Sequence, residues 1–169
     1  MKKAFFLAPA ISLIAFALSA ARAEAQAADS HSWARYGNAR FQYSICYPKD
    51  VLTAEPEAEN GDGRSFSAKD GASLAVWGNN NALSSSLKQE ADDTAQRLAG
   101  STGRVTYRAA RANWAVVSGE SPSGLFYSKI FFDRKQDQFK QFEITYAKAS
   151  AELYKPIVEK IAGCFADLH

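Results

Sequence analysis

Few residues of this sequence have the types and spacing that catalysis requires. The two histidines are His31, in a polar segment, and His169, at the last position, so no regular element is expected to hold either imidazole. A Ser-His-Asp or Cys-His unit needs a histidine that its neighbours orient toward the nucleophile. A zinc site needs about four ligands at workable spacing, whereas the two cysteines, Cys46 and Cys164, lie far apart in the chain. We therefore expect no catalytic residue, no metal site and no cofactor.

A candidate binding site comes from a predicted hairpin. Asp70-Gly71 separates two short strands, 64–69 and 72–78, and Asp-Gly is a strong signal of a two-residue hairpin turn. That turn would place Arg64 opposite Trp77, with Phe66 and Trp77 on one face, where two polar loops meet. Arginine and tryptophan are enriched where partners bind; alternatively, the pair only closes the hairpin end by a cation–π contact. The candidate site consists of Glu59, Asn60, Asp62, Arg64, Trp77, Asn79 and Asn80.

Two charged clusters also suggest chemistry. Residues 54–63 read as a polar loop whose carboxylates could hold calcium, namely Glu55, Glu57, Glu59 and Asp62. The EF-hand spacing is absent, so a solvated loop is the simpler interpretation. A basic stripe of Arg104, Arg108 and Arg111 could contact nucleic acid, but a solvated strand face is the interpretation we favour.

The N-terminal residues predict export. A positive start, Met1-Lys2-Lys3, precedes an apolar stretch from Ala4 to Leu18 and then small residues, which is typical of a secretory signal peptide. The apolar stretch is shorter than the roughly 20 residues that span a bilayer. We expect a signal peptide over residues 1–27, cut after 23 or 27, and a periplasmic or secreted product without stable membrane insertion.

Removal of the signal peptide changes the charge balance. The chain has 20 Lys+Arg and 18 Asp+Glu, and residues 1–27 hold three of the first and one of the second, which leaves 17 of each (20 − 3 and 18 − 1). A neutral domain gives no electrostatic reason to expect nucleic acid as a partner. In an oxidising compartment Cys46 and Cys164 are expected to form a disulfide, with two buried thiols as the alternative. Closing so long a loop is worth roughly 4–5 kcal/mol in the chain-entropy model.

The apolar periodicity predicts the elements that carry these residues. A polar arm covers 28–40, and alternating apolar residues predict a strand over 41–47, which Pro48 ends. A helix is expected up to Ala99, with an apolar stripe that starts at Leu83; Ser86 and Gln89 resemble a capping box and Gly100 a stop. Four strands follow, over 105–109, 113–118, 125–133 and 138–147. A final helix covers roughly 152–166, with Pro156 expected at its first position.

These elements predict one α+β domain over residues 41–169. We expect an antiparallel sheet of about six to seven strands with helices packed on its faces. Phe41, Tyr43 and Ile45 share one face of their strand, and Cys46 points to the other. A bond from Cys46 to Cys164 would therefore place the final helix on the sheet face opposite the aromatic one.

A family resemblance supports this architecture. Residues 41–50 read Phe-Gln-Tyr-Ser-Ile-Cys-Tyr-Pro-Lys-Asp, which is similar to the opening strand of the PsbP/Mog1-like group, and the order of elements is also similar. Residues 59–66 with Asp70-Gly71 resemble small uncharacterised bacterial periplasmic proteins. The group is largely non-catalytic and includes photosystem accessory subunits, a small-GTPase binder and secretion adaptors. The resemblance implies a Mog1/PsbP-like sandwich with a binding or accessory role.

The sequence as a whole therefore favours a binding protein over an enzyme. The leading hypothesis is a non-enzymatic periplasmic binding or accessory module that recognises a protein partner. The alternative is a small-ligand or calcium-binding domain that uses the end of the hairpin near Glu59 and Asn80. A third hypothesis is a hydrolase whose site has no recognisable motif.

Overall fold

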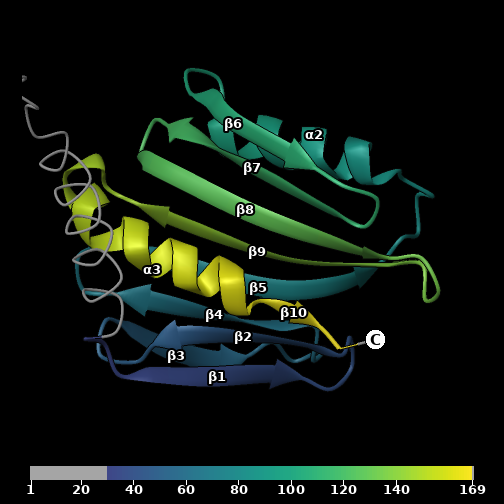
Figure 1. Ribbon diagram of the computed structural model, residues 1–169, viewed down its shortest axis with the longest axis horizontal. Helices are drawn as coiled ribbons and strands as arrows, with labels where there is room; N and C mark the ends of the chain where they lie inside the picture. The colour runs from purple at the N-terminus through teal and green to yellow at the C-terminus, as the bar shows by residue number, and fades with distance from the viewer. Residues whose placement is uncertain (1–29, 169) are drawn as a thin grey trace, which may run out of the picture.

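The computed structural model describes residues 30–168 (Figure 1). The expected signal peptide, both of its cleavage positions and His169 lie outside the described residues. No helix within residues 30–168 is long and apolar enough to cross a membrane.

A seven-stranded antiparallel sheet forms the centre of the fold (Figure 1). Its strands follow in the spatial order β3 (Leu52–Glu57), β4 (Gly63–Ala68), β5 (Ser73–Asn80), β9 (Gln138–Tyr146), β8 (Gly124–Asp133), β7 (Trp114–Ser121) and β6 (Arg104–Ala110). The four strands predicted after the first helix are confirmed as β6 to β9. The prediction of a polar loop over residues 54–63 is wrong for its first part, because Leu52–Glu57 form strand β3, which pairs with β4.

A second sheet of three strands packs against the first. It consists of β1 (Trp33–Asn38), β2 (Tyr43–Pro48) and the short β10 (Ala166–Asp167), with β2 in the middle. The predicted strand over 41–47 therefore belongs to this small sheet and not to the main one. The prediction of an arm over 28–40 is also wrong for β1. Only Tyr36 and Asn38 of β1 are buried, so its sequence carries little apolar alternation, and pairing with β2 is what orders it.

Two α-helices cover opposite faces of the large sheet. Helix α2 (Leu87–Ala99) begins at Ser86, and the predicted capping box with Gln89 and the stop at Gly100 are both present. Leu83 lies outside the helix and is 89% exposed, so the predicted stripe starts one turn too early. A short 3-10 turn, η1 (Lys148–Ser150), leads into α3 (Ala151–Cys164), where Pro156 lies inside the helix and not at its start. The ring removes the donor for the Glu152 carbonyl, and Glu152 is exposed, so water can replace that donor.

Each face of the large sheet has its own apolar core. On one face α3 and the small sheet pack on β4, β5 and β9; the largest fully buried residues there include Tyr43, Ile45, Phe66, Phe142 and Tyr154. On the other face α2 packs on β6, β7 and β8 through Leu87, Ala91 and Ala95. Figure 1 shows α3 in front of the sheet and α2 behind its upper half. The predicted α+β sandwich is confirmed, with the second sheet as an addition, and the face behind β3 to β5 carries no helix.

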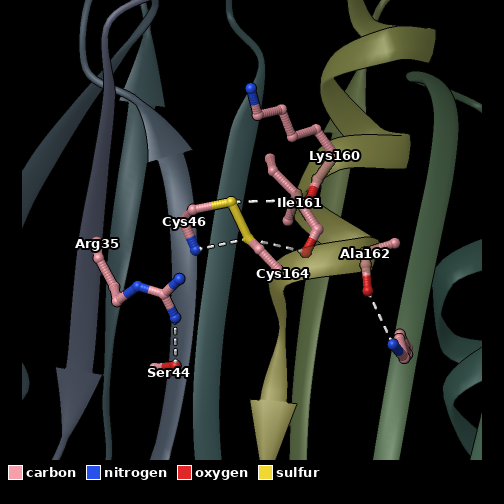
Figure 2. Close-up of a disulfide and its surroundings, with 8 residues drawn as sticks. Arg35, Ser44, Cys46, Lys160, Ile161, Ala162 and Cys164 are labelled. Carbon is pink, nitrogen blue, oxygen red and sulfur yellow. Dashed lines mark hydrogen bonds between the residues drawn. A yellow bond between two sulfur atoms is a disulfide. The ribbon is translucent and has the colours of Figure 1, made fainter. Parts of the chain in front are cut away.

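The predicted disulfide links the small sheet to the last helix (Figure 2). Cys46 of β2 is bonded to Cys164 at the end of α3. Tyr43 and Ile45 lie in the same core as Ile157 and Ile161 of α3. The expectation that α3 would lie opposite the aromatic face of 41–47 is therefore wrong, because that strand forms a separate sheet whose core is shared with α3.

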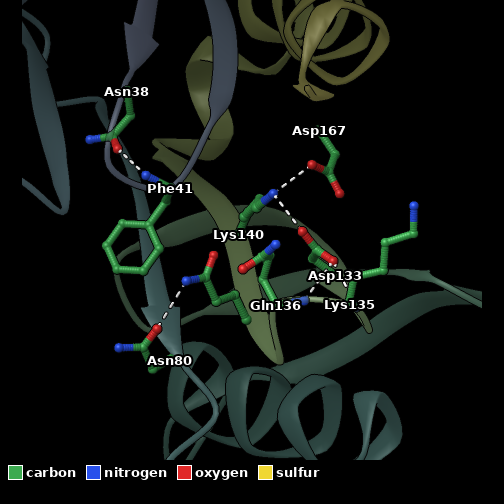
Figure 3. Close-up of polar contacts among 9 residues, drawn as sticks. Asn38, Phe41, Asn80, Asp133, Lys135, Gln136, Lys140 and Asp167 are labelled. Atoms are coloured by element: carbon green, nitrogen blue, oxygen red, sulfur yellow. Dashed lines mark hydrogen bonds and ion pairs between the residues drawn. The ribbon is translucent and has the colours of Figure 1, made fainter. Parts of the chain in front are cut away.

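A buried ion cluster holds β10 in place (Figure 3). The Lys140 side chain of β9 is fully buried, and its Nζ lies 2.5 Å from Asp167 Oδ1 and 3.3 Å from Asp133 Oδ2. Burial alone would raise the pKa of Asp133, but backbone N–H groups of Gln136 and Lys135 and the Lys140 ammonium together lower it. Asp133 therefore stays ionised and keeps Lys140 paired inside the protein.

Candidate functional site

The hairpin that carries the predicted site has a register one residue from the expected one. Gly63 pairs with Trp77 and Arg64 with Val76. The loop has three residues, 69–71, closed by the Ala68 N–H to Ala72 O bond of 2.9 Å, and Gly71 has φ 87°. This is the three-residue loop with a glycine in the left-handed region, which an Asp-Gly sequence suits as well as the two-residue turn. A one-residue shift between two paired strands places the side chains of one strand on the opposite face relative to their expected partners.

Arg64 and Trp77 consequently lie on opposite faces of the sheet. The Arg64 guanidinium carbon lies 5.2 Å from the centre of the Tyr36 ring, on the face that the small sheet covers. Trp77 shares the other face with Ala75 and Gln141 and is half-buried. The predicted contact between Arg64 and Trp77, and the shared face of Phe66 and Trp77, are both wrong.

The predicted loop over residues 59–63 lies against strand β5 and the small sheet, whereas the predicted turn at Asn79–Asn81 is wrong for Asn79 and Asn80, which belong to β5. The Gly78 N–H donates to Asp62 O at 3.0 Å, and the Tyr43 hydroxyl donates to the same oxygen at 3.0 Å. Asn60 Nδ2 donates to Asp62 Oδ2 at 2.7 Å, which closes the loop on itself. Asn38 braces the loop by donating to Gly61 O and accepting from the Phe41 N–H (Figure 3). The loop is thus a rigid turn built on both sheets.

The remaining predicted residues have separate roles. Asn80 Oδ1 accepts from Gln138 Nε2 of β9 at 3.0 Å, whereas Asn79 Nδ2 donates to Asn80 O of its own strand at 3.4 Å. Glu59 is exposed at the turn. Of the seven predicted residues, Asp62, Arg64 and Trp77 line one hollow, and the other four do not.

This hollow, called the Trp77 hollow below, lies on the sheet face that α2 leaves open. Its volume is ≈ 340 Å³. It is lined by Glu55, Pro56, Ala58, Asp62, Gly63, Arg64, Ser65, Ala75, Val76 and Trp77. Gly63 keeps it open beside the indole, because a Cβ there would lie 2.8 Å from Trp77 Cβ and 2.1 Å from Val76 O. Trp77 is therefore set on a rigid strand with one side accessible.

The carboxylates near the hollow point to different partners. Glu55 accepts a hydrogen bond from the Ser67 hydroxyl, and Glu57 accepts one from the Tyr36 hydroxyl at 2.6 Å. Burial and then the Glu57 hydrogen bond raise the pKa of Tyr36, so this phenol stays neutral and serves as a donor. No group of three or more His, Cys, Asp or Glu side chains within residues 30–168 is arranged to hold a metal ion. The four acidic residues considered for calcium do not converge.

A second hollow, which sequence reasoning missed, lies between the edge strand β6 and the start of α2. We call it the β6 groove; its volume is ≈ 580 Å³. It is lined by Ser86, Leu87, Lys88, Ala91, Asp92, Arg108, Ala109, Ala110, Arg111, Ala112, Ala115, Val116, Val117 and Arg134. Arg108 and Arg111 of the predicted basic stripe take part, whereas Arg104 pairs with Glu120 outside the groove. The basic stripe was the part of this groove that the sequence could indicate. Lys88 and Arg134 are distant in the sequence, and only the fold brings them beside it.

His31 is held more firmly than expected. Its Nδ1 lies 2.7 Å from Asp50 Oδ2, and the Ser32 N–H donates to the other oxygen at 2.9 Å. The His31 hydrogen bond lowers the pKa of Asp50. His31 and Asp50 both lie outside the helices and strands, as expected, and the Asp50 carboxylate is the group that orients the imidazole. Within residues 30–168 this carboxylate is its hydrogen-bond partner, and both cysteines are used in the disulfide.

Comparison with solved structures identifies the architecture. The chain matches cyanobacterial PsbP (CyanoP) from Synechocystis sp. PCC 6803 with a TM-score of 0.60 and 14% identity, over 80% of this chain and 92% of that one. The chain has the PsbP/Mog1-like fold. The Ran-binding protein Mog1p of Saccharomyces cerevisiae matches with a TM-score of 0.59 and 8% identity, over 82% of this chain and 96% of Mog1p. No protein-family model and no curated protein matches the chain. The predicted PsbP/Mog1-like resemblance is thus confirmed for the fold, which does not by itself define function.

Proposed function

We propose that this chain is an exported, non-enzymatic binding module that recognises a protein partner through the Trp77 hollow. The observation that carries the proposal is the open sheet face behind β3 to β5. On that face a half-buried tryptophan stands on a rigid strand inside a hollow of ≈ 340 Å³. Tryptophan is one of the three side chains enriched among the interface residues that dominate binding energy.

The surroundings of Trp77 suit a protein surface. Ser65 and Ala75 beside it are small, so the neighbouring sheet is flat and accessible. Asp62 adds a negative rim, and its loop is braced by both sheets, so little ordering entropy would be lost on binding. Mog1p, which has the same fold, binds Ran. A protein partner for this chain agrees with that use of the fold.

Export is part of the proposal. A Cys46–Cys164 disulfide agrees with an oxidising compartment, because such bonds are rare in the cytosol. We expect the mature protein in the periplasm or medium, with an N-terminus at Glu24 or Ala28. Cell fractionation followed by N-terminal sequencing tests this, and an uncleaved cytoplasmic chain would contradict it.

The binding surface is tested by capture of the partner in the native compartment. Trp77→Ala should weaken capture by about 2 kcal/mol or more, roughly thirtyfold in Kd. Ala75→Arg should block the same face without touching either core. Tyr107→Ala is the matched control, because Tyr107 is an exposed aromatic residue on a strand at the other edge of the sheet. Arg64 is a poor choice, since it packs on Tyr36.

The pattern across the variants decides the outcome. A partner that wild type and Tyr107→Ala capture equally, and that Trp77→Ala and Ala75→Arg lose, supports the proposal. Equal capture by all four proteins would reject the Trp77 hollow as the binding surface.

A further inference from the structure

The β6 groove combines an excess of positive charge with the edge of a sheet. Four cationic side chains, those of Lys88, Arg108, Arg111 and Arg134, line it with one carboxylate, that of Asp92, a net charge of +3 (4 − 1). Lys88 and Arg108 both pair with Asp92, at 2.6 Å each. One carboxylate therefore neutralises two cations in part, and the rest of the groove stays positive.

Arg111 and Arg134 are held in place without a carboxylate. Arg134 donates to Ala112 O at 2.8 Å and lies 5.6 Å from the centre of the Phe132 ring. Arg111 donates to Ala110 O at 2.9 Å and lies 5.8 Å from the Trp114 ring. Neither forms an ion pair with a carboxylate of residues 30–168. Each guanidinium has five N–H donors, so donors remain for an acidic ligand.

The edge of β6 offers main-chain hydrogen bonds beside these cations. β6 pairs with β7 on one side and is the last strand of the seven-stranded sheet. The Arg111 N–H is bonded to Trp114 O at 2.8 Å, so alternation along the ladder directs the main-chain groups of Arg108 and Ala110 away from β7. The bulge between Val105 and Tyr107 limits the regular edge to the half next to the groove.

We propose that the β6 groove binds an acidic, extended segment of a protein partner, which pairs with β6 as an added strand. The main-chain groups of Arg108 and the N–H of Ala110 would hold the backbone of the segment, as in other cases of strand addition, while Ala110 O keeps its bond from Arg111. Arg111 and Arg134 would bind its carboxylates. This proposal goes beyond the function proposed above, because the groove lies on β6 and the Trp77 hollow on β3 to β5.

Charged side chains on an edge strand can also serve only to prevent edge-to-edge association, which is the alternative explanation for the charges on β6. The β6 groove differs from a merely protected edge in two respects. Its volume is ≈ 580 Å³, and two of its guanidinium groups are positioned by backbone carbonyls and aromatic rings. A free phosphate ion would bind the cations without pairing with the strand edge, so the test must distinguish anion binding from strand addition.

The test uses the mature, disulfide-bonded protein and a fluorescein-labelled peptide of four Glu-Val repeats in fluorescence anisotropy. Wild type should bind saturably at low salt, and affinity should fall as salt rises. The double variant Arg111→Ala, Arg134→Ala should bind at least about tenfold more weakly, and Arg111→Lys, Arg134→Lys should lie between. Lys69→Ala, at the distant β4–β5 turn, is the control and should bind as wild type.

A second peptide, N-methylated at alternate residues, tests the strand pairing. It keeps every carboxylate but loses main-chain donors, so its Kd should rise by about tenfold or more. Equal binding of both peptides would overturn strand addition, as would equal binding of a Lys-Val peptide or no saturation up to about 1 mM. Trp77→Ala should bind the peptide as wild type, so failure here is distinguishable from failure at the Trp77 hollow.

Discussion

Removal of the disulfide should lower stability without changing the native fold. The bond joins β2 to α3 across a sequence separation of 118 residues. For a loop of that length the chain-entropy model gives roughly 4–5 kcal/mol, because the cross-link restricts the unfolded chain. Helix α3 is also held by Tyr154, Ile157 and Ile161, all fully buried, so it should stay docked when the bond is absent. Cys46→Ala with Cys164→Ala therefore tests the unfolded-state account directly.

The assay is urea denaturation followed by circular dichroism. With a slope of about 2 kcal/mol per M, a loss of about 4 kcal/mol lowers the midpoint by about 2 M. Reductant should produce a similar shift in wild type and none in the double variant, which serves as the control. The near-ultraviolet spectrum of the folded variant should match wild type, because the aromatic core is unchanged.

Two outcomes would refute the reasoning. A midpoint shift below about 0.5 M would show that the long loop contributes little entropy, so that the unfolded chain is already restricted. A folded variant with a lost near-ultraviolet signal would show that the bond holds α3 against the sheet, and that the buried residues of α3 do not suffice.

Three further predictions concern the face shared with the small sheet. Lys140→Met should cost about 3–5 kcal/mol in urea denaturation, because it leaves the carboxylates of Asp133 and Asp167 without their buried cation. The pKa of Asp133 is lowered in the folded state, so the stability that its ionised carboxylate contributes is present above about pH 4 and is lost as pH falls toward the folded pKa. The urea midpoint of wild type should therefore fall between about pH 5 and 2.5, and Asp133→Asn should make this fall smaller. An unchanged pH profile in the variant would contradict this. Gly78→Ala should destabilise by about 1–3 kcal/mol, since a Cβ there would lie 2.4 Å from Phe41 Cγ, and a wild-type melting temperature would show that the ring can move.

Local features of the sequence predicted the elements whose causes are local. The start of α2 depends on Ser86 and Gln89 and its end on Gly100, and all three lie within one turn of the boundary that they define. The strands β6 to β9 follow one another through short turns, so alternation and turn residues were enough to predict them. The disulfide followed from a pair of cysteines together with the expected compartment.

The errors came from contacts between distant segments. β1 has few apolar residues and is ordered by pairing with β2, so its own sequence reads as an arm. The Asp70-Gly71 sequence suits two loop lengths, and the packing of Phe66 and Leu74 in the core selects the three-residue one. That single-residue difference separated Arg64 from Trp77. The β6 groove required α2, β6 and the β8–β9 turn to be placed together, which no local pattern records.

The position of the last segment in the fold also bears on synthesis. Phe165 and β10 come last in the chain, yet Phe165 packs on Tyr43, Phe131 and Phe142, and Asp167 completes the pairing of Lys140. A nascent chain that stops short of α3 therefore exposes the apolar side chains of β2.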